Sequence, residues 1–118
     1  MALLVLSLLF LKHFIFDFLW QTPSEVANKG TYGNLKGLAH SLKHTFGTAV
    51  ALAFFTPIFF PIALLDLVIH YHVDWLKMNY GEQDTTKNRF WKDLGLDQLA
   101  HYMTYILLTY IALRYRWQ

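Results

Sequence analysis

Four pairs of ionisable side chains, each pair spaced four residues apart, lie in the most apolar stretches of this 118-residue chain. Residues i and i+4 share one face of an α-helix, so each pair can act as a two-pronged clamp. Imidazoles and carboxylates are costly to bury unless they are paired or bind a metal ion. The pattern therefore predicts helices that carry a functional site. The pairs are His13/Asp17, His40/His44, His70/Asp74 and Asp97/His101.

The composition indicates a small integral membrane protein, with a soluble all-α protein as the alternative. Hydrophobic residues make up 55% of the chain and charged residues 15%, against roughly 25% charged in an average soluble domain. The length predicts one domain, residues 1–118. Because cysteine is absent, any metal ion must have nitrogen and oxygen ligands. A net charge of +2, without a Lys/Arg stripe, argues against a nucleic-acid partner.

Apolar runs and turn signals predict four helices, over about residues 2–20, 35–55, 62–79 and 90–115. Residues 24–34 and 81–89 are rich in polar and turn-forming residues and are predicted as loops. Two prolines in TPIFFP predict a tight reversal or kink over residues 56–61. The N-terminal run lacks a basic segment and a small-residue cleavage site, which favours a retained helix over a signal peptide. The predicted fold is an all-α, four-helix up-and-down transmembrane bundle.

This layout places the four pairs at one depth. In an up-and-down bundle, the ends of the first and third helices lie beside the starts of the second and fourth. Each pair lies within about two turns, roughly 10 Å, of those ends. We therefore expect one shared buried polar site near one membrane face, and not four separate ion pairs.

The residue types favour a metal site. Imidazoles and carboxylates suit zinc, with manganese or iron as alternatives. Eight ligands exceed the four of a tetrahedral zinc ion, which predicts one to three ions, or one ion with further residues orienting its imidazoles. In a hydrolase, metal-bound water would be the nucleophile and one of the three aspartates the general base. The predicted metal ligands are His13, Asp17, His40, His44, His70, Asp74, Asp97 and His101, and the candidate bases are Asp17, Asp74 and Asp97.

Other polar residues are interpreted by their helical phase. Gln21 and Gln98 are expected to support the site by capping or hydrogen bonding. Lys77 lies one turn beyond Asp74 and either extends to the membrane interface or binds an anionic substrate. His72 is out of phase with the neighbouring pair and is expected at the surface. Lys29 falls in a predicted loop and is expected to be a solvated charge.

The four blocks that carry the pairs are similar to a known family. They closely resemble the bacterial and phage membrane proteins of the domain of unknown function 3307 family, which implies an integral membrane helical protein and no established activity. More distantly, the His-x-x-x-Asp spacing is similar to that of membrane-bound metal-dependent hydrolases and zinc-dependent phospholipases C, so hydrolysis is implied by analogy alone. The blocks are HFIFDFLWQ (13–21), HSLKH (40–44), HYHVDWLK (70–77) and DQLAH (97–101).

Three functions stay open at this point. The first is a zinc-dependent hydrolase of a phosphoester or lipid-like substrate, surrounded by membrane lipid. The second is a transporter or channel-like protein that binds metal ions or protons in the same cavity. The third is a non-catalytic structural or inhibitory subunit, of bacterial or phage origin. Lysines and arginines are more numerous on the site side, so the site is predicted to face the cytoplasm at a bacterial inner membrane. Four short helices are also compatible with a homo-oligomer.

Overall fold

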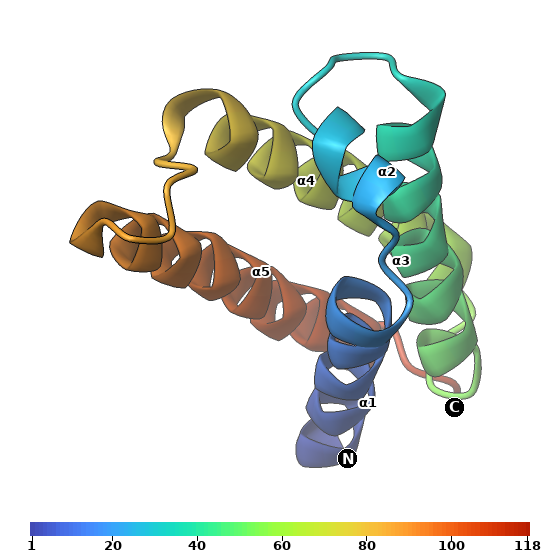
Figure 1. Cartoon of the computed structure of the whole chain (residues 1–118). Helices are drawn as coiled ribbons and strands as arrows, with labels where there is room; N and C mark the ends of the chain where they lie inside the picture. The colour runs from blue at the N-terminus through green and yellow to red at the C-terminus, as the bar shows by residue number, and fades with distance from the viewer.

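The computed structural model describes all 118 residues and contains helices but no strands (Figure 1). Helix α1 spans Ala2–Phe14 and continues into a π-helical turn, η1, over Ile15–Leu19. Helix α2 spans Pro23–Asn28, α3 spans Leu35–Ala53, α4 spans Phe59–Tyr80 and α5 spans Asn88–Arg114. The four long helices therefore lie where the sequence predicts them, within a few residues at each end.

The prediction of a loop over residues 24–34 is wrong in part, because this segment contains most of the short helix α2. Thr22 caps this helix by accepting a hydrogen bond from the Glu25 N–H at 3.2 Å, and Pro23 occupies its first position. The chain then turns through Gly33, whose φ of +79° favours glycine, and Asn34 caps α3. This hydrogen bonding gives α2 a defined position against α3, which places its side chains over the interior of the bundle.

The predicted reversal between the second and third long helices is confirmed. Helix α3 ends at Ala53 and α4 begins at Phe59, three residues earlier than expected. Pro57 lies in the turn, while Pro61 lies in the first turn of α4. A proline in that first turn breaks no intrahelical hydrogen bond, so it does not delay the start of the helix.

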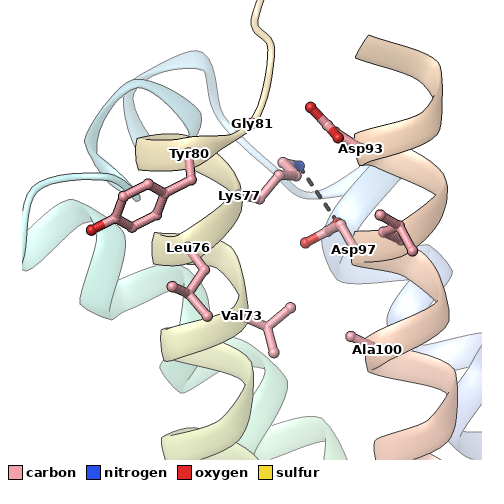
Figure 2. A pocket seen from close by; sticks show the side chains of 9 residues that line it. Val73, Leu76, Lys77, Tyr80, Gly81, Asp93, Asp97 and Ala100 are labelled. Atoms are coloured by element: carbon pink, nitrogen blue, oxygen red, sulfur yellow. Dashed lines mark ion pairs between the residues drawn. The ribbon is translucent and has the colours of Figure 1, made fainter. Parts of the chain in front are cut away.

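The long helices form a ring in which α1 packs on α3 and α5, and α4 packs on the same two helices. The N- and C-termini lie at one end of the molecule, and α4 and α5 diverge toward the other end, where residues 81–87 connect them (Figure 1). A cleft lies between the diverging ends, with Lys77 on one wall and Asp97 on the other (Figure 2).

The distribution of polar residues is inverted relative to a water-soluble protein. Of 28 buried residues, 18 are polar or charged and nine are hydrophobic, whereas apolar residues normally dominate an interior. Large apolar side chains on all four long helices are exposed, among them Leu4, Phe46, Val68 and Ile106. Two helical stretches, Ala2–Leu19 and Phe59–Tyr80, are long and apolar enough to cross a membrane.

Candidate metal centre

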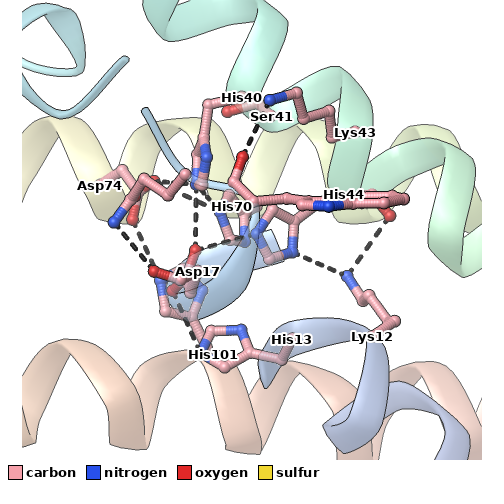
Figure 3. A network of polar contacts seen from close by, with 12 residues as sticks. Lys12, His13, Asp17, His40, Ser41, Lys43, His44, His70, Asp74 and His101 are labelled. Atoms are coloured by element: carbon pink, nitrogen blue, oxygen red, sulfur yellow. Dashed lines mark hydrogen bonds and ion pairs between the residues drawn. The ribbon is translucent and has the colours of Figure 1, made fainter. Parts of the chain in front are cut away.

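All eight residues of the four pairs lie buried in a single polar cluster, and all of them except Asp97 are labelled in Figure 3. None of them is more than 8% exposed. Each long helix contributes one pair, with Asp17 supplied by the π turn that follows α1. The expectation of one shared buried site at matched depth agrees with this arrangement.

The π turn and a glycine on α3 set the position of Asp17. The Trp20 N–H donates to the Ile15 carbonyl oxygen at 2.8 Å, the wide i to i+5 hydrogen bond of this geometry. Phe16 packs tightly on Gly47, where an added Cβ would lie 2.6 Å from the phenyl ring. The absence of a side chain at Gly47 thus permits α1 and α3 to approach closely, which brings Asp17 to the histidines of α3.

The two central aspartates connect imidazoles from different helices. Asp17 Oδ1 lies 2.9 Å from His44 Nε2 and 3.0 Å from His40 Nε2. Asp74 Oδ1 lies 3.1 Å from His101 Nε2, and its Oδ2 lies 3.4 Å from His40 Nε2. Each pair therefore acts mainly across the bundle, and the four helices meet at these carboxylates.

The donor atoms form two overlapping sets that could hold a metal ion. The first set is Asp17, His40, His44 and His70, and the second is His70, Asp74 and His101; within each set all ligand atoms lie within 4.8 Å of one another. His70 belongs to both sets, and one ring nitrogen can bind only one ion at a time.

Three donor atoms have the spacing of a tetrahedral ligand face. His40 Nε2 and His70 Nε2 lie 3.4 Å apart, and Asp74 Oδ2 lies 3.3 Å from His70 Nε2 and 3.4 Å from His40 Nε2. Zinc–ligand bonds of about 2.0–2.1 Å imply tetrahedral edges of roughly 3.3–3.4 Å. Asp74 Oδ2 is buried and accepts no hydrogen bond, although the Lys29 ammonium lies 3.3 Å from it. The buried cluster thus fits a zinc-sized ion.

Glu25 favours a metal-binding form of His40. Its Oε2 lies 3.4 Å from His40 Nδ1, and Lys43 forms an ion pair with its other oxygen. Burial acts to raise the pKa of Glu25, but the hydrogen bond and charge of Lys43, together with His40, hold the pKa below its ordinary value. The resulting carboxylate favours a proton on His40 Nδ1, which leaves the Nε2 lone pair for a metal ion.

Lys12 has the opposite effect on His44. Its Nζ lies 3.2 Å from His44 Nδ1, and an ammonium group can only donate. His44 Nδ1 then accepts, and its Nε2–H donates to Asp17 at 2.9 Å. In this arrangement His44 is a hydrogen-bond partner of Asp17, and it becomes a ligand only when Lys12 moves away.

His13 and Asp97 lie at the edge of the cluster and belong to neither ligand set. His13 Nε2 is 2.8 Å from Gln98 Oε1 and 3.2 Å from Asp17 Oδ2. Asp97 Oδ1 is 3.5 Å from His101 Nε2. The contact with His13 gives Gln98 the supporting position that the sequence predicts.

The remaining predicted residues have simpler surroundings. Gln21 donates to the backbone oxygen of Asp17 at 2.9 Å, and Lys77 Nζ lies 3.5 Å from Asp97 Oδ2. His72 is exposed, as predicted, and contacts the hydroxyl of Tyr32 at 3.0 Å.

Two buried lysines beside the site were not anticipated. Lys29, predicted to be solvated, is 5% exposed, and its Nζ lies 3.3 Å from Asp74 Oδ2 because α2 covers the cluster. Lys12 Nζ lies 2.9 Å from Asp66 Oδ2, and Thr48 also donates to Asp66. Asp66 and Thr48 could have been recognised from the sequence, because each lies one further step of four residues from a pair, on α4 and α3 respectively.

Comparisons with known proteins agree with the resemblance of the four blocks. A family model described as "Protein of unknown function (DUF3307)" matches residues 5–118. No curated protein and no solved structure matches the chain.

Proposed function

The chain belongs to the family of proteins of unknown function DUF3307, and because membership supplies no activity, we propose from the site that it is a membrane-embedded, zinc-dependent hydrolase of a phosphoester or lipid-like substrate. The observation that carries the proposal is the face of donor atoms from His40, His70 and Asp74, with mutual distances of 3.3–3.4 Å. Manganese or iron would suit the same nitrogen and oxygen donors.

The inverted distribution of side chains supports a four-helix transmembrane bundle. Apolar side chains on all four long helices face outward, and the buried interior is mostly polar. In a bilayer, such an exterior contacts lipid tails, while ionisable residues face the bundle interior and pair with one another. The basic residues Lys87, Arg89 and Lys92 near the site end favour a cytoplasmic orientation.

The metal ion would be held by His40, His70 and Asp74, with Asp17 beside them. When bound with an open position, it would supply Lewis acidity and activate a water molecule near neutral pH. Glu25 orients the His40 imidazole from behind, which keeps its Nε2 aimed at the centre, while Gln98 contacts His13 at the edge of the cluster.

Asp97 is the aspartate best placed to act as general base. Asp17 and Asp74 each contact three imidazoles. Asp97, by contrast, contacts one imidazole, that of His101 at 3.5 Å; its Oδ1 accepts no hydrogen bond, and the residue lines the cleft between α4 and α5. A carboxylate with a free oxygen at a cleft can accept a proton from water. Lys77, across the same cleft, can bind an anionic group of the substrate.

Metal analysis and phosphoester hydrolysis of detergent-purified protein test this proposal. We expect stoichiometric zinc, with turnover of a chromogenic phosphodiester or of a phospholipid in mixed micelles. Asp97→Asn should retain zinc but lose at least about 100-fold in kcat, the usual contribution of a general base. The control Asp93→Asn removes a carboxylate from the same cleft that does not contact the histidines. Protein without stoichiometric metal, or zinc-loaded protein without turnover of either substrate, would refute the hydrolase.

A transporter of divalent cations is the second candidate. The observation that favours it is the overlap of the two ligand sets at His70, which suits an ion that binds two positions in turn. Zinc uptake into proteoliposomes, abolished by His70→Ala and unaccompanied by hydrolysis, would replace the first proposal with this one.

A further inference from the structure

The cleft between α4 and α5 is lined by Asp97, which lies 3.5 Å from His101 of the second ligand set. It has a volume of about 290 Å³. Apolar residues such as Val73 and Ala100 form its inner walls, and three charged side chains, Lys77, Asp93 and Asp97, lie nearer its mouth (Figure 2). Because Arg89 lies 3.4 Å from Asp93, Asp97 is the carboxylate of this cleft that an incoming cation would meet, opposite Lys77.

Asp97 links the cleft to the centre. Its side chain is 2% exposed and its Oδ1 atom has no hydrogen-bond partner. That oxygen lies 3.5 Å from His101 Nε2, which in turn lies 3.1 Å from Asp74 Oδ1. The other oxygen of Asp74 lies 3.3 Å from His70 Nε2. Oxygen and nitrogen donors therefore follow one another at short intervals from the cleft to the residue shared by both ligand sets.

Lys77 occupies the position that an incoming cation would need. Its Nζ lies 3.5 Å from Asp97 Oδ2, and its side chain is 24% exposed, so the ammonium group can move to solvent. A divalent cation at Asp97 would displace Lys77 by charge repulsion.

A second cavity reaches the cluster but lacks these features. It lies between α1 and α5, is lined by Phe10, Phe14, Phe18 and Tyr102, and ends at His13. No carboxylate lines it, and a hydrated cation gains nothing from aromatic edges and a single imidazole on this route.

We infer that a divalent cation enters the centre through the α4–α5 cleft, binding first to Asp97 and His101 and then passing to Asp74 and His70. This route rests on the metal centre proposed above, but it concerns how the ion arrives and not what reaction follows.

The rate of metal loading tests the route. Full-length protein in detergent is stripped with a chelator, mixed with Zn²⁺ in a stopped-flow instrument, and followed by competition with a chromogenic chelator. Ala100→Phe fills the inner wall of the cleft and should slow loading about tenfold or more, with stoichiometry and equilibrium affinity unchanged, because access limits the association rate. The control is Leu99→Phe, a neighbouring substitution on the exposed face of α5.

Lys77→Met provides a second variant with the opposite sign. Removal of the competing ammonium should accelerate loading. Loading at the wild-type rate in both Ala100→Phe and Lys77→Met would overturn the route. Protein that binds no zinc at equilibrium would overturn both the route and the metal centre. If the protein binds zinc, loading is slowed in Ala100→Phe and no hydrolysis is found, the route is supported and only the hydrolase is refuted.

Discussion

Replacement of Lys12 by methionine would remove one partner of an ion pair at the centre of the bundle. Lys12 Nζ lies 2.9 Å from Asp66 Oδ2 and 4.6 Å from the centre of the Tyr105 ring. Asp66 is 1% exposed, and its Oδ1 atom has no hydrogen-bond partner. After the substitution, Thr48 would be the one remaining donor to this buried carboxylate.

The expected cost follows from the uncompensated charge. Loss of one partner of a buried pair costs about 3–5 kcal/mol, while replacement of both partners by uncharged groups of similar size is often close to neutral. Methionine keeps most of the lysine stem, so the packing loss is small. At about 3–4 °C per kcal/mol for a chain of this length, Lys12→Met should lower Tm by roughly 10–20 °C.

The assay is thermal unfolding in detergent, followed by circular dichroism, for Lys12→Met, Asp66→Asn and the double variant. We expect each single variant to be strongly destabilised and the double variant to recover to within about 1–2 kcal/mol of wild type, because neighbouring partners are not additive. Lys36→Met, at an exposed lysine, is the control and should change stability by no more than about 0.5 kcal/mol. A cost below about 1 kcal/mol for Lys12→Met, or additive single effects, would show that Lys12 does not pair with Asp66.

Three further predictions concern the cover of the site, the metal and acid. Gly37→Ala should destabilise the protein by about 1–3 kcal/mol, since the new Cβ would lie 2.7 Å from the Asn28 backbone oxygen and push α2 away; urea unfolding measures this, and unchanged stability would contradict the close packing of α2 on α3. Zinc at a hundred times its Kd should raise the unfolding free energy by about 2.7 kcal/mol. A chelator should remove this stabilisation, and the His70→Ala variant should not show it. Equal stabilisation of His70→Ala by zinc would contradict the assignment of His70 as a ligand. Because the folded-state pKa of Glu25 is lowered, its stabilising contribution should be present above its ordinary pKa of 4.5 and should vanish as pH falls through the lower folded-state pKa. Glu25→Gln should flatten that part of the plot of unfolding free energy against pH. An unchanged plot would argue against the Lys43 contact.

Apolar runs and turn signals were enough to predict the long helices, and the four-residue spacing within them was enough to predict the burial of the pairs. Spacing determines which side chains share a helical face, and topology determines which helix ends meet, so His40 and Asp74 could be placed at one depth from sequence. Spacing does not say which neighbour a side chain contacts. The closest carboxylate to His44 is Asp17 on another helix, and His13 pairs with Gln98 as well as with its own Asp17.

The buried lysines illustrate what could not be predicted. Lys29 is adjacent in sequence to turn-forming residues, and nothing local distinguishes it from a solvated charge. Its burial depends on α2 folding back over the bundle, which in turn depends on the close approach of Gly37 to Asn28. Lys12 sits on an apolar helix and pairs with Asp66 from a helix far along the chain. Tertiary packing determines the positions of both lysines, and local helix propensity carries no information about tertiary packing.

The π turn over Ile15–Leu19 limits the insertions and deletions that the N-terminal third of the chain can accept. A π turn holds one more residue than the α turn it replaces. Deletion of one residue between His13 and Asp17 would restore regular helix, but Asp17 would then follow His13 by three residues instead of four and would lie elsewhere on the helix surface. Asp17 and the segment leading to α2 would then lose their alignment with α3. Relatives of this chain should therefore vary in length between α4 and α5, where residues 81–87 are largely exposed, while the spacing from His13 to Glu25 stays constant.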